Sequence, residues 1–316
     1  MEGGGRTGLP LPCFGGHVMH SMKQRKRRQT ATALLFILPF FILFTVFTVY
    51  PIIQGVWVSL NKWSMMGRQK YIGLENFEKL FSDSKFWASL RNTCFFVVVC
   101  APLIVVIALA LAILANRPVK YRKFLRVSYY LPGVLSVSVA SFVSKYTFAP
   151  YRGFVNGVLK YFGLVTTTTE PLWFMSTRLS WVVIVIMTIW WTVGFPMLLY
   201  LAALQDISTE VMEAAAVDGA TPGQQLFQIT LPLLRPTIFL VTMLQIIACF
   251  KVFGQIRLIT GGGPANTTRP LIQYIYEQAF DKNKLGYAAA MSYILFAILV
   301  VCTLVQLRLQ KGDDGR

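Results

Sequence analysis

The chain has 316 residues, of which 55% are hydrophobic and 14% are charged, and this balance excludes an ordinary soluble domain. Its formal net charge of +17 raises nucleic-acid binding, but the basic residues gather beside apolar segments, so no nucleic-acid partner is expected. The composition is that of a membrane protein, and the lipid bilayer is its first expected partner.

Six segments are long and apolar enough to cross a bilayer as helices, which takes about 20 residues each. Pro39 and Pro51 are expected to kink the first segment, whereas Pro132 and Lys145 dilute the third. The predicted fold class is an all-α polytopic membrane protein with six transmembrane helices. In chain order these helices cover residues 31–60, 94–115, 127–148, 180–204, 236–256 and 287–307.

The distribution of basic residues predicts which side of the membrane each loop faces. The positive-inside rule places the segment before the first span and the loop after the second span in the cytoplasm. Six spans then return the C-terminal tail to the same side. Six basic residues in the loop 62–91 weaken this argument, although Glu75, Glu78 and Asp83 dilute them. The cytoplasmic basic residues are Lys23, Arg25, Lys26, Arg27, Arg28, Arg117, Lys120, Arg122, Lys123 and Arg126.

These predictions divide the chain into four parts. Residues 1–29 form a basic cytoplasmic tail that is expected to be disordered, and Met22 is an alternative start of translation. Residues 30–93 hold the first helix and the first extracellular loop. A core of five helices covers residues 94–308 and contains the cytoplasmic loop 205–235, and residues 309–316 form a short cytoplasmic tail.

Residues that would carry catalysis are missing from the predicted spans. The sequence has no Gly-Lys-Ser/Thr phosphate loop, and we interpret Gly261–Pro264 as a tight turn. Both histidines, His17 and His20, lie in the N-terminal tail, so neither a histidine base nor a metal site is expected in the membrane. The five cysteines lack metal or disulfide spacing and are interpreted as packing residues. The chain is therefore predicted to be a non-catalytic subunit without a cofactor.

The loop between the fourth and fifth spans, residues 205–235, differs in charge from the other cytoplasmic segments. An ordinary amphipathic helix at the membrane interface would favour Lys and Arg, so the acidic composition points to a protein partner with basic residues. Ser208 is expected to cap a first short helix, Thr209–Asp218, which Gly219 ends. The loop carries Asp206, Glu210, Glu213 and Asp218 against one basic residue, Arg235.

A second short helix is predicted in the same loop. Thr221–Gln224 has the pattern of a capping box with proline at the first helical position. The helix is expected to run from Pro222 to about Ile229 and to end at Leu231 and Pro232. The two helices together predict a helix-turn-helix beneath the membrane.

Several segments carry a family resemblance that extends over nearly the whole chain after the N-terminal tail. Glu213–Gly219 and Ile229–Pro232 resemble the EAA loop of permease subunits of binding-protein-dependent ABC importers. Tyr71–Phe77, Phe195–Asp206 and Leu258–Pro264 are similar to the carbohydrate-uptake branch, of the maltose and glycerol-phosphate type. The resemblance implies the type I ABC importer permease fold with a cytoplasmic helical coupling loop.

The resemblance also implies a set of partners. The chain would form half of the translocation pathway for a sugar or sugar derivative, beside a second, non-identical permease subunit. An extracellular binding protein would deliver the substrate and dock on loops 63–91, 151–178 and 260–281. A dimer of ATP-binding-cassette ATPases would hold ATP and Mg and receive the coupling helices. The expected location is the bacterial or archaeal cell (inner) membrane, with both termini cytoplasmic.

Two groups of candidate site residues follow from the resemblance and from the residues themselves. Within the coupling loop, Glu213 would pair with a basic residue of the ATPase, the two alanines that follow it would allow close packing, and Gly219 would permit the turn. The full coupling set is Glu213, Ala214, Ala215, Asp218, Gly219, Leu231 and Pro232.

Candidate pathway residues lie in and beside the fourth and fifth spans. A lysine inside a span marks a functional site by default, so Lys251, with Arg257 nearby, is a candidate for contacting an anionic sugar. The alternative for Lys251 is snorkelling to the headgroups from a position inside its helix. Trp190 and Trp191 are candidates for stacking on a sugar ring, with packing as the alternative, and Trp181 fits interfacial anchoring.

Two other classes of function stay open at this point. A secondary transporter driven by an ion gradient would also be polytopic, but it usually shows inverted repeats and intramembrane acids, which this sequence lacks. A membrane-embedded enzyme would need paired carboxylates or histidine near the interface. The identity of the sugar and of the partner subunits is not encoded in this chain alone.

Overall fold

A computed structural model describes residues 32, 34–117 and 121–314 of the chain. The chain divides into two compact units, residues 1–57 and 58–316, and each is described by itself. The predictions for the tail 1–29, including Met22, the basic cluster and both histidines, fall outside the described residues, as does Cys13.

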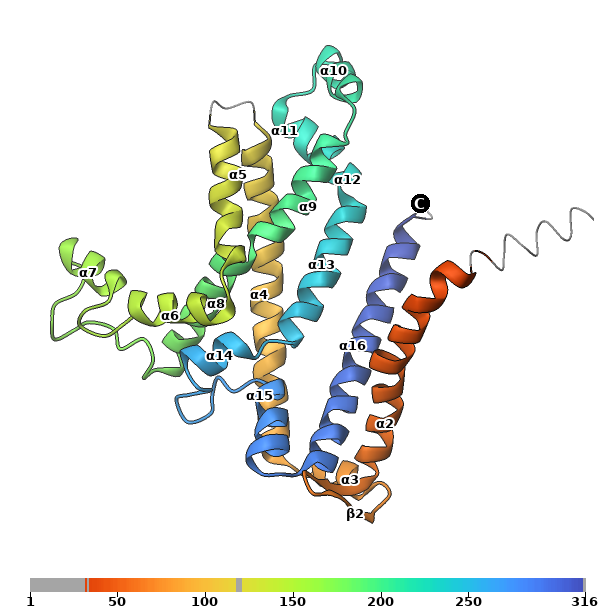
Figure 1. Cartoon of the computed structure of the whole chain (residues 1–316). Helices are drawn as coiled ribbons and strands as arrows, with labels where there is room; N and C mark the ends of the chain where they lie inside the picture. Colours follow the sequence, from red (N-terminus) through yellow and green to blue (C-terminus); the bar gives the residue numbers. More distant parts are fainter. Residues whose placement is uncertain (1–31, 33, 118–120, 315–316) are drawn as a thin grey trace, which may run out of the picture. The chain divides into compact units, whose positions relative to one another are not determined.

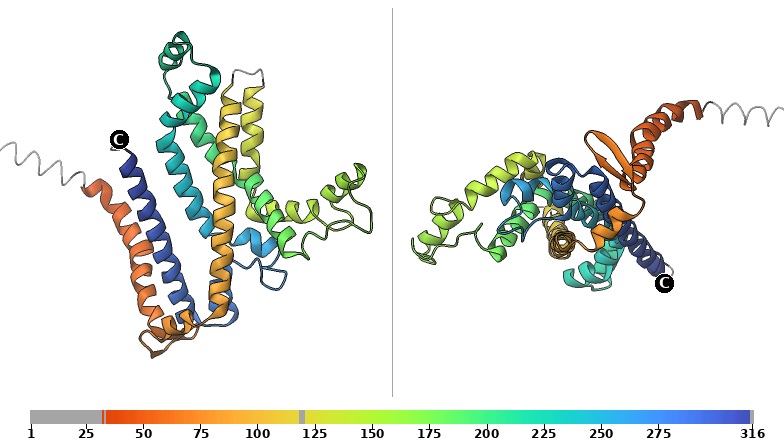
Figure 2. Two further views of the ribbon diagram at one scale, coloured as in Figure 1. Left: turned by 180° about the vertical axis from the view of Figure 1, so that it is seen from behind. Right: turned by 90° about the horizontal axis from the view of Figure 1, so that it is seen from below.

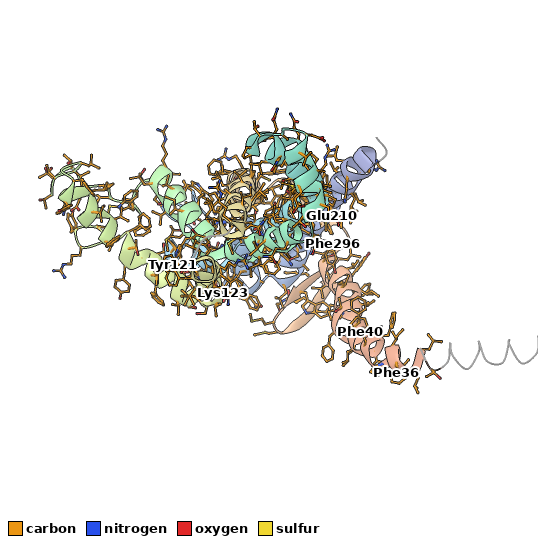
Figure 3. All side chains as sticks on the ribbon, turned by 90° about the horizontal axis from the view of Figure 1, so that it is seen from above. Phe36, Phe40, Tyr121, Lys123, Glu210 and Phe296 are labelled. Atoms are coloured by element: carbon orange, nitrogen blue, oxygen red, sulfur yellow. The ribbon has the colours of Figure 1, made fainter. Side chains whose placement is uncertain are left out.

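The described part of the first unit is one long helix. A helix that is long and apolar enough to cross a membrane runs over Leu34–Ser59, as predicted. It contains a π-helical turn, η1 (Thr45–Val49), followed by α2 (Tyr50–Ser59). Phe40 stacks on Phe44 one turn further on, with ring centroids 5.9 Å apart, and Figure 3 shows Phe40 on the surface of this helix.

The second unit begins with a small structure that the sequence did not predict. Strands β1 (Asn61–Ser64) and β2 (Gly67–Tyr71) pair antiparallel as a hairpin, and helix α3 (Glu75–Phe81) follows. The Asn76 side chain of α3 donates hydrogen bonds to the carbonyl oxygens of Ser59 and Asn61, at 2.7 and 3.1 Å. The expected first loop is therefore a folded cap.

Helix α4 (Ser84–Asn116) is the central helix of the second unit, and α9 and α13 pack against it. Ala108, Ala112 and Ala115 lie on one face of α4 and are fully buried, which allows the close helix approach typical of membrane proteins. The helix begins at Ser84 and not at Cys94 as predicted, because its polar first turns extend beyond the apolar run that hydropathy detects.

Three of the six predicted spans are bent pairs of helices. The third consists of Lys123–Val134 and Val137–Thr147, which meet at 101°. The fourth consists of Thr177–Thr192 and Gly194–Gln205 at 46°. The fifth was predicted over 236–256, but Arg235–Phe250 pairs at 64° with Pro222–Leu233, which was predicted as the second helix of the cytoplasmic loop. Hydropathy carries no information on these bends.

The remaining elements complete the second unit. Helix α16 (Leu285–Asp314) confirms the sixth span and extends beyond the predicted 287–307 at both ends. In Figures 1 and 2, α6 and α7 extend away from α4, whereas α13 and α16 lie closer to it. The other helices are α5 (Arg122–Tyr130), η2 (Leu131–Val134), α6 (Val137–Thr147), α7 (Phe154–Tyr161), α8 (Thr177–Thr192), α9 (Gly194–Gln205), α10 (Thr209–Val217), α11 (Pro222–Gln224), η3 (Gln225–Thr230), α12 (Leu231–Leu233), α13 (Arg235–Phe250), α14 (Gly254–Ile259), α15 (Leu271–Tyr276) and η4 (Glu277–Asp281).

The second unit has two distinct ends (Figure 1). One end carries α10, the end of α4, the start of α5 and the C-terminal end of α16, and the opposite end carries the hairpin and α3. The view from above shows α10 with Glu210 and the start of α5 with Tyr121 and Lys123 on the near side (Figure 3). Three of the four segments predicted to be cytoplasmic therefore have their described residues at one end of the second unit.

Candidate functional site

Helix α10 forms where the sequence predicted the first helix of the coupling loop. It covers Thr209–Val217, and the Ser208 hydroxyl accepts a hydrogen bond from the backbone N–H of Glu210 at 3.2 Å. Gly219 ends the helix with φ of +83°, a left-handed conformation that favours glycine. The N–H of Ala220 then donates to the carbonyl oxygen of Ala215 at 2.9 Å, which satisfies a carbonyl of the last turn.

The second helix of the loop starts as predicted and ends differently. Thr221 and Gln224 form the predicted capping box, in which the Thr221 N–H donates to Gln224 Oε1 at 2.8 Å. The helix does not end at Leu231 and Pro232, however, because π-helical η3 and then α12 carry the chain on to Leu233. The loop therefore continues into the fifth span through a bend and has no separate end.

The surface of α10 combines acidic and apolar side chains. Glu213, Ala214 and Asp218 are exposed, whereas Ala215 is buried. Val217 is 88% exposed, although an apolar side chain normally avoids such exposure unless a partner or lipid covers it. None of the acids Asp206, Glu210, Glu213 and Asp218 forms an ion pair with any residue that the structure describes.

Lys251 does not lie inside a helix, which corrects the sequence prediction. Helix α13 ends at Phe250, and Lys251 is its exposed C-terminal cap, followed by the break before α14. The Lys251 side chain therefore does not have to snorkel to the headgroups from a position inside the helix. Arg257 lies on α14, with its guanidinium carbon 4.4 Å from the centre of the Tyr276 ring and 5.8 Å from that of Phe253.

The tryptophans of the fourth span occupy three different environments. Trp191 donates a hydrogen bond from its indole N–H to the carbonyl oxygen of Leu135 at 3.0 Å, and Trp190 is exposed. Trp181 is only 8% exposed, and its ring lies 5.2 Å from that of Phe95, so it packs in the core and is not an interfacial anchor. Within the described part of the chain, no hydrogen bond, ion pair or ring contact joins Lys251 or Arg257 to Trp190 or Trp191.

The segment after α14 forms a compact turn, as predicted. The N–H of Gly263 donates to the carbonyl oxygen of Thr260 at 3.0 Å, and the Thr268 hydroxyl donates to the carbonyl oxygen of Gly263 at 2.7 Å. Arg269 forms an ion pair with Glu277 at 3.1 Å. This loop is held internally and presents no phosphate-binding lysine.

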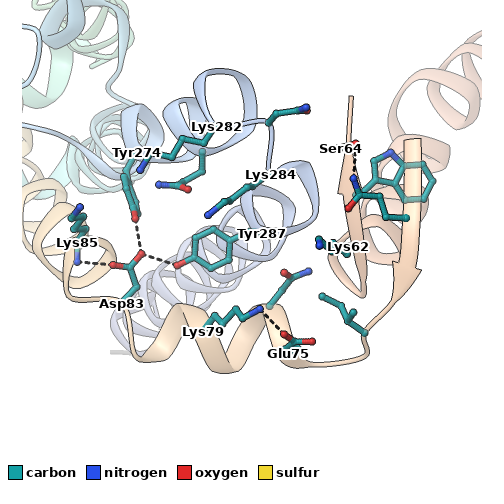
Figure 4. A pocket seen from close by; sticks show the side chains of 16 residues that line it. Lys62, Ser64, Glu75, Lys79, Asp83, Lys85, Tyr274, Lys282, Lys284 and Tyr287 are labelled. Carbon is teal, nitrogen blue, oxygen red and sulfur yellow. Dashed lines mark hydrogen bonds and ion pairs between the residues drawn. The ribbon is translucent and has the colours of Figure 1, made fainter. Parts of the chain in front are cut away.

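A cavity of about 860 Å³ lies at the end opposite α10, and sequence analysis missed it (Figure 4). It is formed by the hairpin, α3, the segment from α15 to α16 and the start of α4. Five lysines are among its lining residues, together with Trp63, Gln278 and two acids. The lysines are Lys62, Lys79, Lys85, Lys282 and Lys284.

Asp83 joins three helices at the edge of this cavity (Figure 4). Its Oδ2 accepts hydrogen bonds from the hydroxyls of Tyr274 and Tyr287 at 2.6 and 2.8 Å, and its Oδ1 accepts from the N–H of Lys85 at 2.9 Å. Burial raises the pKa of Asp83, but these hydrogen bonds together outweigh it and lower the pKa below its usual value. Burial, with the bond to Asp83, raises the pKa of Tyr274.

Comparison with known proteins identifies the family. Residues 77–312 match the family described as binding-protein-dependent transport system inner membrane component. The chain belongs to this family. It is therefore a permease, and the ion-gradient-driven secondary transporter is excluded. The predicted permease fold is confirmed, with helices that cross the membrane several times.

The permease is similar to characterised relatives over most of its length. It is 33% identical to the sulfoquinovosyl glycerol transport system permease protein of Agrobacterium fabrum, over 89% of this chain and 91% of that protein. It is also 33% identical to the lactose transport system permease protein of Rhizobium radiobacter, over 90% of this chain and 96% of that protein. A chain in the crystal structure of a bacterial alginate ABC transporter, in complex with an alginate pentasaccharide-bound periplasmic protein, matches with a TM-score of 0.78 and 26% identity, over 90% of this permease and 94% of that chain.

Proposed function

We propose that this permease forms half of the pathway of an ATP-driven sugar importer and that α10 couples it to a separate ATPase. The observation that carries the coupling is the exposed end of α10, where the acids are unpaired among the described residues and Val217 is uncovered. Relatives named for the transport of lactose and of sulfoquinovosyl glycerol support a sugar or sugar derivative as the cargo.

The surface of α10 indicates the kind of partner that would receive it. A hollow with a basic residue at its rim would complement it, because Glu213 would form a charge-assisted pair while Ala214 and Val217 lie in the hollow. Asp218, at the exposed C-terminal end of α10, would offer a second carboxylate to the same partner. A dimer of ATP-binding-cassette ATPases is the partner that fits the family.

Short connections on both sides would pass a displacement of α10 to the membrane helices. On one side α9 ends at Gln205, and on the other α11, η3 and α12 lead directly into α13. Both α9 and α13 pack against α4. Leu231 and Pro232 lie in α12 just before the bend and would be part of this lever.

The orientation of the permease follows from its charges. The α10 end carries Arg117 at the end of α4 and Lys123 on α5, so the positive-inside rule would put this end in the cytoplasm. Both termini are expected on the same side of a bacterial or archaeal cell membrane. The hairpin end would then face outward and receive the extracellular binding protein. A second, non-identical permease subunit would complete the pathway.

ATP and Mg would bind to the ATPase and not to this permease. Among the described residues no group of three or more His, Cys, Asp and Glu side chains could hold a metal ion. Substrate would pass the break between α13 and α14, where Lys251 is exposed and Arg257 lies over Tyr276. Trp190 and Trp191, on α8, are retained as candidates for stacking on a sugar ring.

Replacing Glu213 tests the coupling directly. In the complete transporter reconstituted in proteoliposomes, Glu213→Lys would place a cation against the basic residue of the ATPase. We expect uptake to fall by about tenfold or more while the permease stays in the membrane, since truncating or reversing a buried charge pair costs several kcal/mol. ATP hydrolysis and uptake of labelled substrate are measured together.

The matched control is Asp206→Lys, the same charge reversal at an exposed position that lies before α10 and outside the assigned coupling and docking residues. It should leave ATP-dependent uptake close to the wild-type rate. Normal uptake by a correctly assembled Glu213→Lys transporter would remove the role assigned to this residue.

A further inference from the structure

The cavity at the hairpin end has walls that are fixed by contacts between distant parts of the chain. The backbone N–H of Met65, at the hairpin turn, donates to Oδ1 of Asn283 at 2.6 Å across 218 residues of sequence. A Cβ atom at Gly286, in the first turn of α16, would lie 2.1 Å from the carbonyl oxygen of Asn61. The hairpin therefore lies directly against α16, and the cavity is formed before any ligand binds.

The cavity carries an excess of positive charge. Its two acids are already engaged, because Glu75 pairs with Lys79 and both oxygens of Asp83 accept hydrogen bonds. The pairing with Lys79 lowers the pKa of Glu75. The other four lysines form no ion pair with a residue in the described part of the chain; they are Lys62, Lys85, Lys282 and Lys284.

Gln278 adds an independent observation that points to a ligand. Its residue is only 3% exposed and lines the cavity, and no hydrogen bond joins its side-chain amide to another described residue. The amide is not among the fully buried polar groups that lack a partner, so it reaches the open space of the cavity, where it is available to a ligand that donates or accepts. Trp63 lines the same cavity and offers an aromatic face.

We propose that this cavity binds a water-soluble oligoanion of about disaccharide size, which carries two or more carboxylate, phosphate or sulfonate groups. Its volume of about 860 Å³ lies within the range of small-molecule sites. Ammonium groups on four separate positions suit several anionic groups spread over one ligand, and Gln278 would bond to its hydroxyls. The binding requires neither α10 nor an ATPase, so the proposal is independent of the coupling.

Binding to the full-length permease in phosphatidylcholine nanodiscs tests the proposal, with digalacturonate as the anionic probe and maltose as the neutral one. Digalacturonate is expected to bind and maltose is not. Because both charged walls contribute, Lys62→Gln/Lys284→Gln should weaken binding of digalacturonate about tenfold and reduce its dependence on salt. The matched control is Lys123→Gln/Lys145→Gln, which removes two exposed lysines outside the cavity and should keep wild-type affinity.

Gln278→Met separates a ligand-binding role from a structural one. It should weaken digalacturonate binding several-fold while the melting temperature stays level, since the amide that is replaced forms no hydrogen bond with another described residue. A Gln278 that only stabilises the fold would instead lower the melting temperature and leave the affinity unchanged, which contradicts the proposal.

Other outcomes would overturn the assignment. Equal binding of maltose, or equal loss of affinity in the control double variant, would show that the cavity does not select an oligoanion. Loss of digalacturonate binding in phosphatidylglycerol nanodiscs would assign the site to a lipid headgroup. Binding of hexaglutamate without binding of digalacturonate would assign it to an acidic protein segment.

Discussion

The two ends of the second unit are stabilised in opposite ways. At the α10 end the hydrogen bonds join neighbours, as between Thr221 and Gln224, which are three residues apart. At the hairpin end they join distant segments, as between Met65 and Asn283 or between Asp83 and Tyr287, 204 residues apart. The first end can therefore act as a small unit that a partner displaces, whereas the second holds its shape through the whole fold.

The largest loss of stability is expected from a substitution that disrupts the packing of the hairpin end. In Gly286→Ala the added Cβ would meet the Asn61 carbonyl oxygen, so the hairpin must move away from α16. Overpacking of this kind costs about 3 kcal/mol, and the melting temperature of the detergent-solubilised permease should fall clearly. Gly223→Ala is the control, because a Cβ there meets no atom within 4 Å. Equal melting temperatures for both variants would contradict the close packing of the hairpin.

Asp83→Asn tests the hairpin end by removing a charge, and it should destabilise the fold less than Gly286→Ala does. The hydrogen bonds of a carboxylate contribute about 2 kcal/mol. The amide retains only one accepting oxygen, so it cannot serve both the two tyrosine hydroxyls and the Lys85 N–H. The folded-state pKa of Asp83 is lowered, so its stabilisation is present above the unfolded pKa and is lost as pH falls through the lower folded value. Melting temperatures between pH 3 and about pH 7 should show this acid loss in the wild type and less of it in Asp83→Asn. Parallel pH profiles would exclude the assigned role.

The smallest effect on stability is expected at the α10 end. Gly219→Ala forces a side chain into a left-handed conformation with open space around it, which costs about 1 kcal/mol. Because the strain is local, the melting temperature should change little, while hydrogen exchange of the α10 amides should become faster. Ala220→Gly, next to it, is the control. A global loss of stability in Gly219→Ala would show that this end is not a local unit.

The same contrast explains what could be predicted from the sequence. Ser208, Gly219 and Thr221 were correctly assigned because capping depends on residues within one turn of each other. The straight spans, such as α4 and α16, were found by hydropathy, but the bends were not, since the average over a window does not register the break after Phe250 or at Leu234. Asp83 could have been recognised as the N-cap of α4, but no local signal connects it to Tyr287.

The candidate site was predicted unevenly for the same reason. Glu213, Ala214 and Ala215 lie on α10 as expected, whereas Leu231 and Pro232 lie in α12 and do not end the helix. The role of the coupling residues stays a prediction. Lys251 was placed inside a helix because its neighbours are apolar, and only the break in the backbone corrects this. Lys62, Lys79 and Lys85 were visible as part of the basic loop 62–91. They meet Lys282 and Lys284 only through contacts between residues 62–85 and 274–287, which the sequence does not reveal.

The bend between α12 and α13 has a mechanical consequence for a protein that must change shape in a bilayer. A straight transmembrane helix that is pushed at one end would move along its own axis and would have to carry its side chains through the lipid. Because Pro222–Leu233 and α13 meet at 64°, a displacement of the shorter segment along its own axis would move α13 sideways. Opening and closing a passage between helices requires sideways motion of that kind.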